Sequence, residues 1–153
     1  MDMSKEISGD LAKFLEPFPG RVRETALWLR DFVWNLHPDS NELIYDNYNA
    51  LAIGFGLSDR AGDVYCSIAV YSKYSNFGFL RGTEIADPKR LLKGGGSLYR
   101  YITVEDIGDF PVEDMKLLTA DAYINAVSRL KGEQTLKGAI ITKSVSPKKR
   151  RPA

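Results

Sequence analysis

Residues Ala50-Leu51-Ala52-Ile53-Gly54-Phe55-Gly56-Leu57 decide the fold of this chain. Large apolar side chains alternate strictly with alanine and glycine here, and successive side chains of a strand point to opposite faces of a sheet. The pattern therefore predicts a strand with one buried face. A connection at residues 58–62 leads to a second alternating stretch, in which Val64, Cys66, Ile68 and Val70 are interleaved with Tyr65, Ser67, Ala69 and Tyr71. The two stretches together predict an antiparallel hairpin.

Helical patterns lie on both sides of this hairpin in the sequence. Residues 18–36 place apolar side chains at three- and four-residue steps, which predicts an amphipathic helix that begins near Pro19 and ends before Pro38. A shorter helix is predicted over residues 8–15. After the hairpin we expect strands over residues 77–80 and 98–104, a short helix between them over residues 87–92, and one or two helices that end near Leu130. The expected fold class is α+β, with a mainly antiparallel sheet of about four to six strands packed with helices.

Length and composition predict one domain with no overall attraction to polyanions. The 153 residues carry a formal net charge of +1, so no global field draws the chain to nucleic acid or to a membrane. We expect a single domain over residues 1–143 and a flexible basic tail over residues 144–153, limited to nonspecific contacts with nucleic acid. Residues 132–142 fit either a short strand or a loose connection. With one cysteine and one histidine, the chain has no internal disulfide and no thiolate or imidazole metal cluster, and a cytoplasmic location is expected.

A second informative stretch is Leu91-Leu92-Lys93-Gly94-Gly95-Gly96-Ser97-Leu98-Tyr99-Arg100-Tyr101-Ile102, in which three glycines join the predicted short helix to the next strand. A glycine run either turns the chain or presents backbone N–H groups to an anion, and turning is favoured because the spacing of a phosphate-binding loop is missing. Arg100 falls in register with Leu98 and Ile102, so we expect a carboxylate or an anion to meet it. Glu42 is the predicted partner, and an anion held together with the N–H groups of residues 94–97 is the alternative.

The face opposite the large apolar side chains is the predicted binding surface. It combines the small residues of both strands with tyrosines that the register adds to the same side: Tyr65, Tyr71, Tyr99 and Tyr101. Such a shallow amphipathic face suits a flat small molecule, a partner protein or a second copy of the chain in a homodimer. The alternative is that a helix covers this face and uses the small residues for close packing.

Three motifs give the chain a resemblance to a known family. They are Glu42-Leu43-Ile44-Tyr45 after the long helix, the hairpin, and the stretch from Leu91 to Ile102. In this order, over about residues 10–128, the chain resembles the YdhG-like family, a domain of unknown function. The resemblance implies a frataxin-like α+β fold and, because some members are described as intracellular iron chaperones, iron as a cargo. Iron favours oxygen donors, and the densest candidate ligands are Glu105, Asp106, Asp109, Glu113 and Asp114, although acids at a helix start also serve as caps.

The sequence therefore predicts a noncatalytic module that binds a small molecule or a protein. The candidate ligand-binding residues are Glu42, Tyr45, Tyr65, Tyr71, Tyr99, Arg100 and Tyr101. An intracellular iron chaperone is the alternative function, and no cofactor other than iron is expected. An enzyme is not expected because Cys66 lies on the apolar strand face and His37 at a helix end, which leaves no base and nucleophile to pair.

Overall fold

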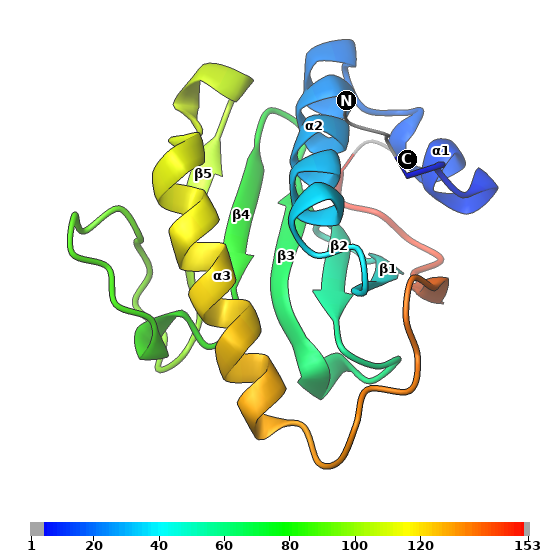
Figure 1. The fold of residues 1–153 in the computed structure, drawn as a ribbon. Coiled ribbons are helices and arrows are strands. Elements are labelled where there is room, and N and C mark those ends of the chain that lie inside the picture. The colour runs from blue at the N-terminus through cyan, green and yellow to red at the C-terminus, as the bar shows by residue number, and fades with distance from the viewer. Residues whose placement is uncertain (1–4, 152–153) are drawn as a thin grey trace.

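Six strands form one sheet at the centre of the computed structural model, which describes residues 5–151 (Figure 1). They span Asn41–Asp46 (β1), Leu51–Gly56 (β2), Val64–Val70 (β3), Ser75–Phe79 (β4), Arg100–Val104 (β5) and Ile140–Val145 (β6). The order across the sheet is β5-β4-β3-β2-β1-β6. Strands β1 to β5 form consecutive antiparallel pairs, whereas β6 pairs parallel with β1. The predicted α+β fold class is confirmed.

Helices α2 (Gly20–Leu36) and α3 (Val112–Arg129) lie across one face of this sheet (Figure 1). The shorter α1 (Gly9–Leu15) lies beside β6, where Thr142 donates a hydrogen bond to Asp10 (2.7 Å). The helices predicted over residues 8–15 and 18–36 are confirmed. Ser8 caps α1 by accepting a hydrogen bond from the backbone N–H of Leu11 (3.1 Å), which satisfies one of the free donors at a helix start.

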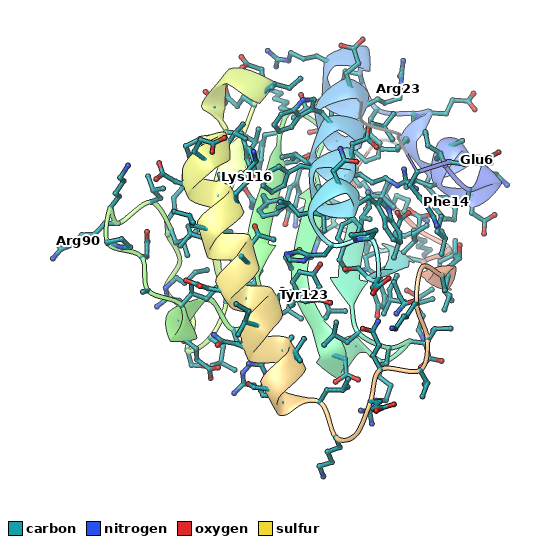
Figure 2. The ribbon with its side chains drawn as sticks, in the orientation of Figure 1. Glu6, Phe14, Arg23, Arg90, Lys116 and Tyr123 are labelled. Carbon is teal, nitrogen blue, oxygen red and sulfur yellow. The ribbon has the colours of Figure 1, made fainter. Side chains whose placement is uncertain are left out.

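The helix predicted over residues 87–92 does not form, and most of the chain between β4 and β5 is an irregular loop. Asp87 accepts hydrogen bonds from the backbone N–H groups of Leu91 (3.0 Å) and Leu92 (2.8 Å). Its carboxylate therefore replaces the backbone acceptors that a helix would offer. Arg90 has a positive φ of 53°, incompatible with a right-handed helix, and extends away from the sheet (Figure 2).

The core lies between the sheet and the helices α2 and α3. Ile53, Phe55 and Ile68 are fully buried on the helix-facing side, as the alternation in the hairpin predicts. Ile53 lies opposite Ile68 in the register, which confirms the hairpin. Aromatic rings fill the space between the layers: Phe32 of α2 packs edge-to-face on Phe77 of β4, with 5.9 Å between the ring centroids.

A β-bulge in β3 changes which tyrosine faces the helices. Phe55 is opposite Cys66 and Gly56 is opposite Val64, so Tyr65 is the extra residue of the bulge. Tyr65 consequently points into the helix-covered side, where its ring packs edge-to-face on Tyr123 of α3 (5.3 Å). The prediction that Tyr65 lies on the opposite face is wrong, because the extra residue reverses the alternation at the start of β3.

The C-terminal segment belongs to the sheet and then follows β1. Strand β6 continues past residue 143, where the sequence placed the start of a flexible tail. Beyond it, Ser146 donates its backbone N–H to the carbonyl of Asp46 (2.8 Å), and Arg150 donates its backbone N–H to Tyr48 (2.9 Å). Residues 146–151 therefore lie along the end of β1 and the turn into β2.

Candidate ligand-binding face

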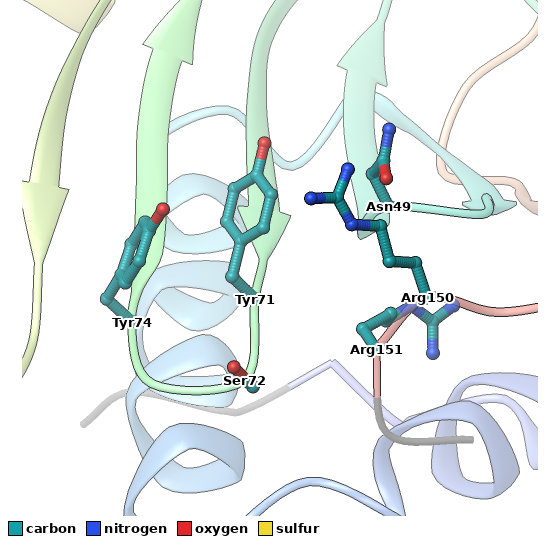
Figure 3. A pocket seen from close by; sticks show the side chains of 6 residues that line it. All are labelled: Asn49, Tyr71, Ser72, Tyr74, Arg150 and Arg151. Atoms are coloured by element: carbon teal, nitrogen blue, oxygen red, sulfur yellow. The ribbon is translucent and has the colours of Figure 1, made fainter.

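Small residues lie at the centre of the face of the sheet that points away from α2 and α3. Ser67 of β3 lies opposite Gly78 of β4, and Ala69 lies two residues further along the same strand, opposite Asn76. Ser67 and Ala69 are partly exposed. In Figure 3, which views this face from its own side, α2 lies behind the strands. The sequence left open whether a helix covers this part of the sheet, and α2 and α3 both pack on the other side.

Two pairs of stacked tyrosines lie on the same face of the sheet as these small residues. The rings of Tyr71 and Tyr74 are 5.1 Å apart at an interplanar angle of 28°, and those of Tyr99 and Tyr101 are 5.6 Å apart at 22°. Tyr99 lies directly over Gly78, where an added Cβ would come within 2.6 Å of its ring carbon Cε1. A glycine is therefore required beneath this ring. We call the surface made by Tyr71, Tyr74, Tyr99 and Tyr101 the tyrosine face.

The electrostatics of these side chains show that the two pairs adjoin each other. Burial raises the pKa of Tyr99 to about 12, with a further contribution from Tyr71, while a hydrogen bond with Ser67 opposes the shift. Burial also raises the pKa of Tyr71, helped by Tyr74 and Tyr101. The hydroxyl groups of Tyr71 and Tyr99 therefore stay protonated at neutral pH and serve as hydrogen-bond donors and acceptors.

Two segments of the chain, residues 71–74 and 99–101, supply the tyrosine face. Tyr71 continues the alternation of β3, Tyr101 of β5 lies opposite Gly78, and Tyr99 belongs to the loop that precedes β5. Tyr74 was missed by the sequence analysis because it follows no strand pattern. Its carbonyl accepts the backbone N–H of Tyr71 (2.9 Å), which closes the turn between β3 and β4 and brings the two rings together. The signal available in the sequence was the three-residue spacing of two tyrosines at a predicted strand end.

A pocket of about 540 Å³ opens at one end of the tyrosine face. Its lining residues come from the β1–β2 turn, the β3–β4 turn and the C-terminal segment: Asn49, Tyr71, Ser72, Tyr74, Arg150 and Arg151 (Figure 3). Figure 3 shows the guanidinium of Arg150 between the ring of Tyr71 and the amide of Asn49. This pocket combines an aromatic wall with a cationic one, and the sequence analysis did not predict it.

Asp46 holds the C-terminal segment in place beside this pocket. Lys149 lies 3.3 Å from one of its carboxylate oxygens, and Arg151 donates a hydrogen bond to the other. Arg151 also lies over the ring of Phe18, 5.3 Å from its centroid. The side chains of Asp46 and Arg151 are only 6% and 4% exposed. This ion pair is therefore shielded from water, and charges attract each other more strongly in such a buried environment than in water.

Glu42 lies on the helix side of the sheet and not at the tyrosine face. It accepts hydrogen bonds from Nε of Arg30 and Nε1 of Trp34, both at 2.7 Å. Burial raises the pKa of Glu42, and the charge of Arg30 opposes that shift. The predicted pairing of Glu42 with Arg100 is wrong. The signal for its true partner was in the sequence, because Arg30 lies four residues after Ala26 and three before Val33 on the apolar side of α2.

Arg100 stabilises the glycine loop that precedes β5. Its guanidinium donates hydrogen bonds to the carbonyl oxygens of Gly96 (2.6 Å) and Tyr99 (2.8 Å). The side chain thus fixes the turn that carries Tyr99 and helps to position the tyrosine face without belonging to it. Tyr45 shares the open side of the sheet with its partner Ala52 on β2, and its buried Oη has no hydrogen-bond partner within residues 5–151.

The five acids predicted as metal ligands do not converge. A 3-10 helix over Ile107–Asp109 occupies two of them: Asp106 caps the N–H of Gly108 (2.7 Å), and Asp109 accepts the N–H groups of Glu105 (3.0 Å) and Asp106 (3.2 Å). Asp114 pairs with Lys89 (3.0 Å) and Glu113 with Lys116 (3.3 Å). Within the described part of the chain, no group of three or more His, Cys, Asp or Glu side chains is arranged to hold a metal ion. Local backbone donors and lysines thus engage four of the five acids that the sequence assigned to iron.

Comparisons with models of protein families, with curated proteins and with solved structures found no match to this chain. The resemblance to the YdhG-like family therefore stays a prediction that rests on the three motifs. In residues 5–151, no helix has the length and apolar composition of a membrane span.

Proposed function

We propose that this protein is a noncatalytic binding domain that holds a small planar molecule on its tyrosine face. The observation that carries the proposal is the convergence of four tyrosine rings, from two segments of the chain, on the side of the sheet away from α2 and α3. The rings stand beside a pocket of about 540 Å³. Small-molecule sites generally measure about 300–1,000 Å³ and are lined by aromatic groups with a few polar ones.

The chemistry of the face supports a flat ligand. Tyrosine rings offer apolar area for stacking and a hydroxyl group for hydrogen bonding. Gly78 lies under the ring of Tyr99, whereas Ser67 and Ala69 are small and partly exposed, so a planar molecule has room to approach the sheet beside that ring. The core has its own aromatic cluster on the other side, around Phe32 and Phe77, and does not include these tyrosines.

Iron delivery, the function that the resemblance implies, has less support. A site for iron needs several oxygen donors directed at one point. Asp106 and Asp109 are engaged by backbone N–H groups, and Asp114 is paired with Lys89. Catalysis by the two reactive side chains is also not supported: burial raises the pKa of Cys66, and His37 stacks on Tyr123 on the helix side (4.0 Å).

The test uses two probes of the same shape, 2-naphthoate and its neutral amide, 2-naphthamide, titrated by isothermal calorimetry. We expect saturable binding of at least one probe, and a loss of about tenfold or more in affinity for Tyr71→Leu, because stacking on one aromatic side chain contributes about 1–3 kcal/mol. Tyr48→Leu is the control, because Tyr48 is 48% exposed in the β1–β2 turn and does not line the pocket. Binding of neither probe, or equal losses for both variants, would contradict the proposal.

A further inference from the structure

We infer that the ligand of the tyrosine face is a planar aromatic anion, with its carboxylate or phosphate group held by Arg150. This inference rests on the proposed function and adds the charge of the ligand and the residue that selects for it. Two arginines line the pocket, and none of its lining residues is acidic. The aromatic and cationic walls meet at Tyr71 and Arg150 (Figure 3).

Arg150 differs from its two basic neighbours in what its side chain contacts. Lys149 and Arg151 both bind Asp46, which neutralises part of their charge. The guanidinium of Arg150 makes no hydrogen bond or ion pair within residues 5–151 and points toward Tyr71 instead. Its five N–H donors therefore stay available for an acceptor that enters the pocket.

The backbone around Arg150 is held in place beside the pocket. Its N–H donates to the carbonyl of Tyr48 (2.9 Å), and the residues on either side are attached to Asp46. A guanidinium matches the two oxygens of a carboxylate or a phosphate and stacks on aromatic rings, which a lysine does less well. A backbone that is already held lowers the entropy lost on binding, because only the side chain of Arg150 has to become ordered.

Asn49 and Ser72 supply the remaining polar groups of the pocket. An amide and a hydroxyl group, both uncharged, are suited to hydrogen-bond the anion without adding charge. The aromatic part of the ligand then extends from Tyr71 and Tyr74 along the sheet toward Tyr99. The structure thus assigns one end of the site to the anion and the other to the ring system.

The test compares 2-naphthoate with 2-naphthamide on the full chain and on Arg150→Gln. We expect the wild type to bind the anion more tightly than the amide by about tenfold or more, since hydrogen bonds to charged groups contribute about 1.5–3 kcal/mol. Arg150→Gln should lose this preference, because its affinity for the anion should fall more than its affinity for the amide. Lys148→Gln is the matched control: it removes the same charge from the same segment, does not line the pocket, and should keep the preference.

The outcomes separate the two proposals. Equal affinity of the wild type for both probes, with Tyr71→Leu still weakening both, overturns the anion inference and leaves the proposed function standing. Equal effects of Lys148→Gln and Arg150→Gln also overturn it, because they would mean a diffuse positive field and not a contact. Titration of 2-naphthyl phosphate, which carries its anion at the same ring position, distinguishes the two sources of the anion: tighter binding than 2-naphthoate indicates a phosphate ester, and weaker binding a carboxylate.

Discussion

Gly78→Ala tests the packing of the tyrosine face at its tightest point. The added Cβ would lie within 2.6 Å of Cε1 of Tyr99, and the three atoms nearest to it, the hydroxyl oxygen and two ring carbons, all belong to that side chain. Tyr99 must therefore swing away from the sheet. A buried tyrosine side chain covers about 150–250 Å². If the displaced ring exposes about half of this area, about 100 Å², the free energy of unfolding falls by about 2.5 kcal/mol. Loss of stacking on Tyr101 adds about 1 kcal/mol, and alanine in place of glycine offsets about 0.5–1 kcal/mol, so the net loss is about 2.5–3 kcal/mol.

Urea unfolding followed by circular dichroism measures this loss, and a second background isolates its cause. In Tyr99→Ala the obstructing ring is gone, so Gly78→Ala should stabilise that variant by about 0.5–1 kcal/mol, because alanine costs less backbone entropy than glycine. The sign of the effect thus reverses between the two backgrounds. A loss of the same size in both would refute the reasoning, because it would mean that Cβ meets something other than Tyr99.

Three further predictions concern groups on the helix side of the sheet. Glu42→Gln removes the nearer and fully buried carboxylate of Arg30 (2.7 Å, against 4.0 Å to the partly exposed Asp31), so the free energy of unfolding should fall by about 3–5 kcal/mol. Arg30→Met combined with Glu42→Leu should recover most of that loss in the same urea assay. Burial lowers the pKa of His37, the only histidine, below its ordinary value of 6.5. The folded state therefore binds a proton less readily than the unfolded state does. The free energy of unfolding should be highest above pH 6.5 and should decline as the pH falls through the lower pKa of the folded state. Proton NMR titration of the single imidazole checks the direction, and a stability decline that persists unchanged in His37→Phe would contradict it. Cys66 is fully buried, and burial raises the pKa of its thiol. An aromatic disulfide reagent should therefore label Cys66 only after urea has unfolded the chain. Rapid labelling of the native protein would contradict this prediction.

Much of the fold follows from local patterns in the sequence. The alternation around Ile53 and Ile68 predicts the central hairpin and its buried side, because a strand repeats every two residues. The steps from Phe18 to Leu36 predict α2. The same alternation correctly places Tyr71 and Tyr101 on the side away from the helices. Local periodicity thus predicts which face a residue occupies as long as the register is unbroken.

The errors arise where a non-local contact decides the structure. The bulge at Tyr65 depends on the close approach of Gly56 to the carbonyl oxygen of Asp63, which would lie only 2.9 Å from a Cβ added at Gly56. No residue in this part of the sequence indicates that a bulge forms here. Strand β6 is parallel to β1 and about a hundred residues distant from it, so its pattern gives no sign of the partner. Asn41 fixes this pairing by accepting the N–H of Ala139 (3.0 Å), a contact that only the folded chain reveals. The pocket beside Arg150 depends on that pairing and was therefore outside the reach of sequence reasoning.

The most direct test of the central claim, that the tyrosine face binds a planar ligand, is chemical-shift mapping of the isotope-labelled protein during titration with 2-naphthoate. The account predicts saturable shifts of the backbone amides of Ser67, Ala69 and Gly78, with little change on the outer side of α3, where Leu117 is 69% exposed. Shifts confined to α3, or no saturable shift at any residue, would contradict it.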